Sequence, residues 1–154
     1  MSPPHSAFFI PTPFPLMLKL LLSAFIGSGI GGTIRFFVSH FFASRSSLPS
    51  LASSAEEVSF FVLFPWHTFL VNIAGCFIIG LVYACVEHNI FSISPEMKTF
   101  LTVGICGGLT TFSTFSHESL LLFQSGHPFT ALGYISLSLL LGVGAALLGH
   151  VIIK

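Results

Sequence analysis

Two phenylalanines, Phe112 and Phe115, lie three residues apart in the stretch GICGGLTTFSTFS, with Ser113 and Thr114 between them. The edge of an aromatic ring carries partial positive charge, so rings presented edge-on can stabilise a small anion without a full cation that would trap it. Hydroxyl donors beside the rings would replace part of the hydration that the anion loses. The alternative for a phenylalanine pair at this spacing is ordinary packing in the core or against lipid. We therefore treat the pair as candidate anion-binding side chains.

The residues directly before this pair are poor helix formers. Gly107 and Gly108 are adjacent, and Thr110 and Thr111 follow, in a segment that otherwise has the composition of a membrane helix. Glycine and threonine weaken a helix, so we expect this one to loosen or break near the middle of the bilayer. Backbone polar groups freed in hydrocarbon are costly unless protein, water or an ion satisfies them. We expect such a break to be buried and to serve a purpose.

Other polar side chains inside apolar segments are candidates because such groups usually face protein or a cavity. Asn72 can hold two helices together or donate two hydrogen bonds to an anion. Tyr134 and Ser138 share one helix face at i and i+4, and bonding back to the preceding turn is their alternative role. Arg35 either extends to the membrane surface or lies near an anion path or a helix C-terminus. Glu118 is a candidate for facing a vestibule.

Residue types that serve as nucleophiles or metal ligands show no catalytic pattern. Ser116, His117 and Glu118 are consecutive, so their side chains spread around a helix and cannot form a relay. The cysteines lack the spacing of a zinc site or a disulfide framework, and packing is their simplest role: Cys76, Cys85 and Cys106. We interpret the remaining histidines as side chains of the tail or the membrane surfaces: His5, His40, His67, His88, His127 and His150. A membrane enzyme is therefore the function class that we expect least.

The composition indicates what kind of protein positions these side chains. Of the 154 residues, 53% are hydrophobic and 6% are charged, and the mean hydropathy is +0.96. A soluble domain carries roughly 25% charged residues, so this chain cannot cover a water-facing surface. The basic and acidic residues number 5 each, so no net charge directs the chain to nucleic acid. We predict an all-α integral membrane protein.

Four segments have the roughly 20 mostly apolar residues that a membrane span needs. We predict a four-helix membrane domain over residues 16–154, with spans at about 16–42, 65–87, 96–123 and 129–153. Residues 1–15 contain five prolines, which oppose a helix, and we predict a flexible tail rather than a cleaved signal peptide. Residues 43–62 are predicted to form a serine-rich connection whose Ser-Ala-Glu-Glu portion is a short surface helix.

Four spans place both termini on one side of the membrane, with similar numbers of basic residues on the two sides. Lys19, Lys98 and Lys154 lie on one side, and Arg45 with the deeper Arg35 on the other. Because the imbalance of Lys and Arg sets orientation, the chain inserts either weakly one way or both ways. Dual insertion would allow an antiparallel dimer. Four helices hardly enclose a water-filled route alone, so we expect self-association.

Small residues at helix spacing are compatible with close packing between membrane helices. Gly27 and Gly31 form a GxxxG pattern in the first predicted span, and Cys76 and Gly80 form a similar pair in the second. Such patterns occur often by chance, so they indicate close packing without identifying the partner.

Three motifs together resemble the Fluc (CrcB) family of fluoride channels: GGTIRF at 31–36, TFLVNIAGCFIIG at 68–80 and GGLTTFSTFSHE at 107–118. They are similar to the first-span GAxxR motif, the second-span Asn motif and the long, specific third-span signature of that family. The resemblance covers most of the chain. It implies four-span subunits that assemble as antiparallel, dual-topology homodimers with two narrow pores in the plasma membrane (the inner membrane of a bacterium). Fluoride would leave the cytoplasm passively, which relieves its toxicity.

The resemblance also implies a sodium ion at the dimer centre, held by the backbone carbonyls of Gly107 and Thr110 from both subunits at the break in the third span. Carbonyl oxygens suit a hard cation. One buried positive charge would also lower the barrier to an anion, whose transfer into hydrocarbon is costly.

The same resemblance implies roles along the anion pathway. Phe112 and Phe115 would be the pore aromatics, Asn72 the amide donor, and Tyr134 and Ser138 the polar track of the last span. Conduction requires sites weak enough to release the ion, and ring edges and hydroxyls meet that requirement better than a lysine. The half-helix after the break adds a partial positive charge at its N-terminus.

Three positions depart from the family pattern. Cys76 stands where serine is common and His67 where glycine is common. Gly142 occupies the next turn of the polar track, where a hydroxyl is expected.

Two other functions remain open at this point. A small dual-topology, proton-coupled exporter needs a carboxylate deep in a span, and the first predicted span contains no acid. A non-conducting assembly protein would use the polar residues only to join helices. It predicts that Phe112→Ile changes stability but not anion flux.

Overall fold

The computed structural model describes residues 13–45, 60–88, 90 and 92–153, and within these ranges it contains helices and no strand. The long helices are α1 (Phe14–Arg45), α3 (Trp66–Glu87) and α7 (Pro128–Ile152). A short helix, α2 (Phe60–Leu63), precedes α3. Between α3 and α7 the chain forms α4 (Pro95–Thr99), the π-helical segment η1 (Phe100–Cys106), α5 (Gly107–Leu109) and α6 (Phe112–Gln124).

Three of the described helices are long and apolar enough to cross a membrane: Phe14–Phe42, Trp66–Glu87 and Pro128–Ile152. Both ends of each of these segments lie within two residues of the first, second and fourth predicted spans, 16–42, 65–87 and 129–153. The third predicted span, 96–123, is divided among α4, η1, α5 and α6, each shorter than 18 residues. The chain is thus an all-helical, multi-pass membrane protein over its described part.

The ends of the elements differ from the sequence prediction in three places. α1 begins at Phe14 and includes Pro15, because proline is tolerated in the first turn of a helix, where its missing N–H has no helical partner. α1 continues to Arg45, and α2 occupies the end of the predicted 43–62 connection. Most of the predicted tail and the predicted surface helix lie outside the described residues.

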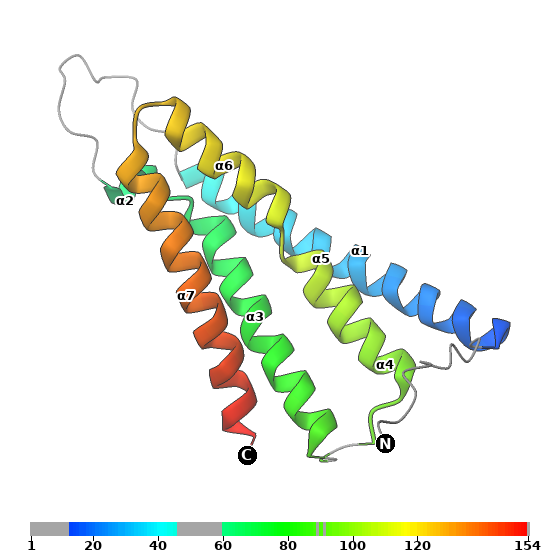
Figure 1. The fold of residues 1–154 in the computed structure, drawn as a ribbon. Coiled ribbons are helices and arrows are strands. Elements are labelled where there is room, and N and C mark those ends of the chain that lie inside the picture. The colour runs from blue at the N-terminus through cyan, green and yellow to red at the C-terminus, as the bar shows by residue number, and fades with distance from the viewer. Residues whose placement is uncertain (1–12, 46–59, 89, 91, 154) are drawn as a thin grey trace, which may run out of the picture.

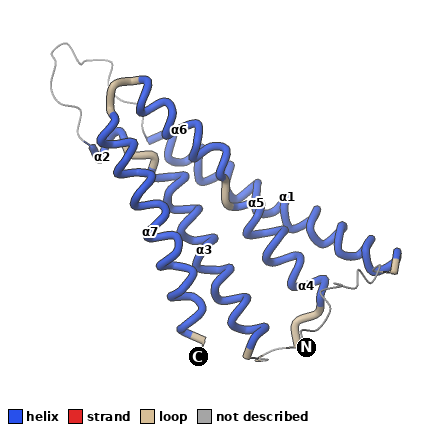
Figure 2. Tube along the Cα trace, in the orientation of Figure 1, coloured by secondary structure: helices blue, strands red, loops and turns tan. Residues whose placement is uncertain are grey.

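The helices pack as two close pairs (Figures 1 and 2). In one pair α1 lies against η1 and α5, and in the other α3 lies against α7. α3 and α7 end at the same side of the bundle, where His150 Nε2 lies 3.5 Å from Glu87 Oε2. The segment from α4 to α6 runs along the bundle, from the end where α3 finishes to the end where α7 begins.

Glycines allow the backbones of α1 and η1–α5 to approach closely. A Cβ atom on Gly27 would lie 2.6 Å from the carbonyl oxygen of Phe100 and 2.7 Å from the Cα atom of Gly104. A Cβ atom on Gly108 would lie 2.6 Å from the carbonyl oxygen of Ser28, and Gly31 also faces this backbone. The GxxxG pattern of the first span therefore packs within one chain.

The helical path stops at two threonines rather than at the glycines before them. Gly107 keeps helical angles (φ −64°, ψ −35°), whereas Thr110 (φ −81°, ψ 153°) and Thr111 (φ −148°, ψ 114°) are extended. Figure 2 shows this short loop between α5 and α6. Threonine is a good N-cap, and Thr111 Oγ1 accepts a hydrogen bond from the N–H of Thr114 at 3.2 Å. The new helix starts here because Thr111 caps it.

Candidate functional site

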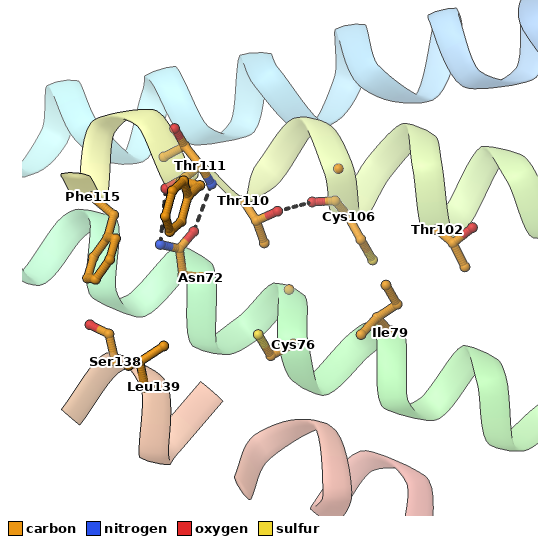
Figure 3. A pocket seen from close by; sticks show the side chains of 13 residues that line it. Asn72, Cys76, Ile79, Thr102, Cys106, Thr110, Thr111, Phe115, Ser138 and Leu139 are labelled. Atoms are coloured by element: carbon orange, nitrogen blue, oxygen red, sulfur yellow. Dashed lines mark hydrogen bonds between the residues drawn. The ribbon is translucent and has the colours of Figure 1, made fainter. Parts of the chain in front are cut away.

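A cavity of about 360 Å³ lies between the two helix pairs, beside the interrupted segment (Figure 3). Its lining comes from α3, η1, α5, the two extended threonines, α6 and α7. Six residues that the sequence singled out line it: Asn72, Gly107, Thr110, Phe112, Phe115 and Ser138. No lysine, arginine or acid is among the described residues that line the cavity.

Asn72 on α3 braces the extended backbone at Thr111. Its Oδ1 atom accepts a hydrogen bond from the N–H of Thr111 at 2.8 Å. Its Nδ2 atom donates a longer one to the carbonyl oxygen of the same residue at 3.4 Å (Figure 3). A primary amide has two N–H donors, so the second hydrogen of Nδ2 remains for another acceptor in the cavity that Asn72 lines. Asn72 can therefore hold the Thr111 backbone in place and donate a hydrogen bond to an anion at the same time.

The hydroxyls of Ser113 and Thr114 gather around the Thr111 cap. Thr111 Oγ1 donates to Thr114 Oγ1 at 3.0 Å and lies 3.2 Å from Ser113 Oγ. Both residues belong to the first turn of α6, and their side chains are exposed in the single chain. Neither lines the cavity, so their predicted role beside the rings stays a prediction.

The interruption diverts the donors of two backbone carbonyls. In a continuous helix the N–H of Thr111 would bond to the carbonyl of Gly107, and the N–H of Thr114 to the carbonyl of Thr110. Here the first N–H donates to Asn72 Oδ1 and the second to Thr111 Oγ1. The carbonyls of Gly107 and Thr110 thus lose their regular helical donors, and such oxygens suit a hard cation. These two residues fit the predicted sodium ligands, although the role itself stays a prediction.

A row of aromatic rings leads from the cavity into the bundle. The ring centroids of Phe112 and Phe115 are 5.8 Å apart, and those of Phe115 and Tyr134 are 5.1 Å apart. Phe112 is 79% exposed in the single chain, whereas Phe115 packs against the buried core around Tyr134. Phe115 therefore takes part in core packing, whereas Phe112 does not.

Glu118 lies at the end of this row and accepts hydrogen bonds from two hydroxyls. Tyr134, which is fully buried, donates to Oε2 at 2.8 Å, and Thr68 donates to Oε1 at 2.7 Å. His67 Nε2 also lies 3.0 Å from Oε1. The structure thus joins Glu118 and Tyr134, which the sequence named separately.

Sequence reasoning missed Thr68 and His67 as partners in this cluster. Thr68 precedes Asn72 by four residues, so a helical face shared with Asn72 was the available signal. His67 was interpreted as a surface histidine, and nothing in the spacing of the chain indicated its contact with Glu118.

Ser138 is the buried polar side chain without a hydrogen-bond partner in the part of the chain that the structure describes. Its Oγ atom is shielded from solvent, and the residue lines the cavity one helical turn after Tyr134. A buried hydroxyl without a partner is costly, and a ligand in the cavity could accept its hydrogen bond.

Arg35 does not join the other predicted site residues. It lies on α1 outside the cavity lining and has no hydrogen bond or ion pair with another described residue. Its predicted place near the anion path stays a prediction.

The chain is similar in sequence to proteins of one family. The family model described as CrcB-like protein, Camphor Resistance (CrcB), matches residues 22–150. A fluoride-specific ion channel FluC of Bacteroides fragilis is 39% identical over 132 residues, which cover 86% of this chain and 94% of the relative. Its counterpart in Leptospira interrogans is 39% identical over 136 residues, covering 88% and 94%. That of Flavobacterium psychrophilum is 48% identical over 91 residues, covering 59% and 73%.

Proposed function

This chain belongs to the CrcB family, and on that premise we propose that it is a fluoride-specific ion channel that exports fluoride passively from the cytoplasm and relieves fluoride toxicity. The observation that carries this function is the cavity beside the interrupted segment. It combines two aromatic rings, an amide with an unused hydrogen and a buried hydroxyl without a partner. These groups are uncharged, and each interacts only weakly with an anion.

Fluoride is small and strongly hydrated, so a pathway must replace its lost water without holding it. Asn72 and Ser138 supply N–H and O–H donors to the cavity, and Phe112 and Phe115 contribute aromatic rings, whose edges carry partial positive charge. Each interaction is weaker than an ion pair with lysine or arginine, which allows release. The N-terminus of α6 adds partial positive charge beside the rings.

The segment from Pro95 to Gln124 is proposed to be a fourth membrane span that is interrupted at Thr110 and Thr111. Its course along the whole bundle supports this proposal (Figure 1). Irregular backbone at membrane depth is tolerated where protein or a polar cavity covers it, and here Asn72 and the cavity lie beside it.

Two copies are proposed to assemble as an antiparallel, dual-topology homodimer in the plasma membrane, which is the inner membrane in a bacterium. The exposure of Phe112 supports this assembly, because the residue is 79% exposed in the single chain beside the cavity. The near balance of basic residues between the two membrane sides is compatible with insertion in both directions. Cross-linking of single cysteines placed at residue 112 in a cysteine-free background should give dimers, and exclusively monomeric protein would contradict the assembly.

A sodium ion is proposed to bind the carbonyls of Gly107 and Thr110, whose helical donors are diverted. When bound, it would supply one positive charge at the interrupted segment. Exhaustive dialysis against sodium-free buffer should weaken the dimer or fluoride transport, and unchanged behaviour of both would contradict this site.

Fluoride efflux from liposomes that contain the purified chain tests the function, with chloride as the control ion. We expect rapid fluoride efflux and little chloride efflux. Phe112→Ile should lower fluoride flux at least about tenfold, which corresponds to about 1.4 kcal/mol in the barrier. Phe129→Ile is the matched control, because Phe129 is also exposed (87%) but lies at the start of α7, outside the cavity.

Two results would contradict this proposal, the first in its mechanism and the second in the role of Phe112. Flux that requires a proton gradient would indicate a coupled exporter. Undiminished flux in a destabilised Phe112→Ile variant would indicate that the phenylalanine serves packing alone.

A further inference from the structure

Two thiols line the cavity beside the interrupted segment, and the proposed anion pathway uses neither of them. Cys76 projects from α3 and Cys106 from η1, and Figure 3 shows both side chains directed into the space between these two helices. Both are free cysteines; Cys76 is half-buried, and Cys106 is only 2% exposed. Sulfur is a soft ligand, so a soft metal cation is the kind of ligand that this pair suits.

α3 and η1 lie close together where they carry the two thiols. A Cβ atom on Gly75, the residue before Cys76, would lie 3.9 Å from the carbonyl oxygen of Cys106. The two sulfur atoms are near enough for a charge on one to act on the other. A Cβ atom on Gly142 of α7 would lie 3.6 Å from the Sγ atom of Cys76, and glycine leaves this position empty. The pair therefore lies between α3 and η1 with open space on its α7 side.

The ligand set restricts the class of cation. The described residues contain no group of three or more histidine, cysteine or acidic side chains that could hold a metal. Zinc takes three or four such ligands, so the cavity does not suit it. Mercury(II) is satisfied by two thiolates in a line. Each thiol gives up its proton when its sulfur binds a metal, so two thiolates balance the charge of a divalent cation and leave no net charge in the apolar bundle.

We propose that Cys76 and Cys106 form a binding site for one soft, two-coordinate metal cation, and that the bound cation closes the anion pathway. The second part rests on the proposed function. Asn72 and Ser138, the donors of that pathway, line the same cavity of about 360 Å³, so a metal held there occupies space that the anion needs. With mercuric chloride as the probe, two Hg–S bonds form, two chloride ions leave and two protons are released, without any change of oxidation state.

Mercury retention tests the binding site without reference to flux. The purified full chain carrying Cys85→Ser is treated with mercuric chloride and passed through a desalting column that contains free cysteine as a competing monothiol. Cys85 is outside the cavity lining, so this background keeps the pair. We expect about one mercury atom per chain, because two thiols on one protein outcompete single thiols in solution. Zinc chloride should not be retained.

Single substitutions test whether both thiols are ligands. Cys76→Ser and Cys106→Ala, each added to the Cys85→Ser background, should retain at least about tenfold less mercury. Cys106→Ser is a second variant at the buried position, in case the alanine variant does not fold. Absence of retention in the parent protein would overturn the site. Retention that survives either single substitution would show that one thiol suffices, and would overturn the pair.

Fluoride efflux from liposomes tests the closure of the pathway. Mercuric chloride should lower efflux through the Cys85→Ser protein at least about tenfold, and an added dithiol should restore it. The concentration that halves efflux should rise at least about tenfold in Cys76→Ser and in Cys106→Ala. Retained mercury with undiminished efflux would overturn the closure. Absence of fluoride efflux before mercury is added would overturn the proposed function, whereas the mercury site would still be decided by retention.

Discussion

The contact of α1 with η1 and α5 differs from the contact of α6 with α3 and α7 in what fills the space between the helices. Between α1 and η1–α5, glycines bring backbone against backbone, and Gly27 and Gly104 leave no room for a Cβ atom. Between α3 and α7 the backbones also meet, at Gly80 and Gly149, but the contacts of α6 with α3 and α7 are made by polar and aromatic side chains, and a cavity remains beside them. The first region is close-packed and the second keeps unused hydrogen-bond donors.

This difference indicates that the two parts of the interrupted segment have different roles. Its η1–α5 part is fixed by close packing on α1, which resists small displacements because packed interiors yield little. Its extended residues and α6 face Asn72, Tyr134 and the cavity. The rigid face can hold the interruption in place while the polar face exchanges water for an anion.

Gly27→Leu should have the largest effect because it attacks the rigid region. Its side chain would collide with the backbone of Phe100 and Gly104, and we expect a cost of about 3 kcal/mol or more. Size-exclusion chromatography and thermal melting in detergent should show loss of the folded, monodisperse protein. Gly29→Leu is the matched control, since no atom lies within 4 Å of a Cβ placed there. Equal tolerance of both substitutions would remove the distinction between the two regions.

Asn72→Ala should have the next largest effect, because this side chain joins the two regions at Thr111. The N–H of Thr111 would lose its acceptor, at a cost of about 1–3 kcal/mol. We expect fluoride flux from liposomes to fall at least about tenfold. Asn72→Asp keeps an oxygen for Thr111 but removes the amide donor and adds an acid. Wild-type flux in Asn72→Asp would show that the residue only braces the backbone.

Ser138→Ala should have the smallest effect, and it tests whether a single hydroxyl of the polar region contributes to fluoride flux. Its Oγ atom has no partner, so stability should change by less than about 0.5 kcal/mol. If the hydroxyl donates to the passing anion, flux should fall about two- to tenfold, the equivalent of one hydrogen bond. Ser136→Ala, an exposed serine on the same helix, should leave flux unchanged. A loss of stability without a loss of flux would assign Ser138 to the scaffold.

The sequence predicted the class of protein and most of the elements because these depend on local properties. Apolar runs of sufficient length identify α1, α3 and α7, and Pro65 marks the start of α3. The site residues could be named from their types and positions, since Asn72 and Ser138 are polar residues in apolar segments and Phe112 follows the predicted break, and all three line the cavity. The position of the extended residues was less predictable. The glycines are the weaker helix formers, yet Thr111 caps α6 and pairs with Asn72 from another helix.

The sequence by itself determined that this chain lies in a membrane, and it identified the polar side chains within the apolar segments. Hydropathy and residue type suffice for this, because each segment carries them without its neighbours. Partnership between segments was decided only by the tertiary structure. Gly27 and Gly31 pack within the chain rather than against a second copy, and Glu118 gains Thr68, Tyr134 and His67 as partners. Such contacts join residues 16 to 78 positions apart, and no local pattern encodes which of several possible faces will meet.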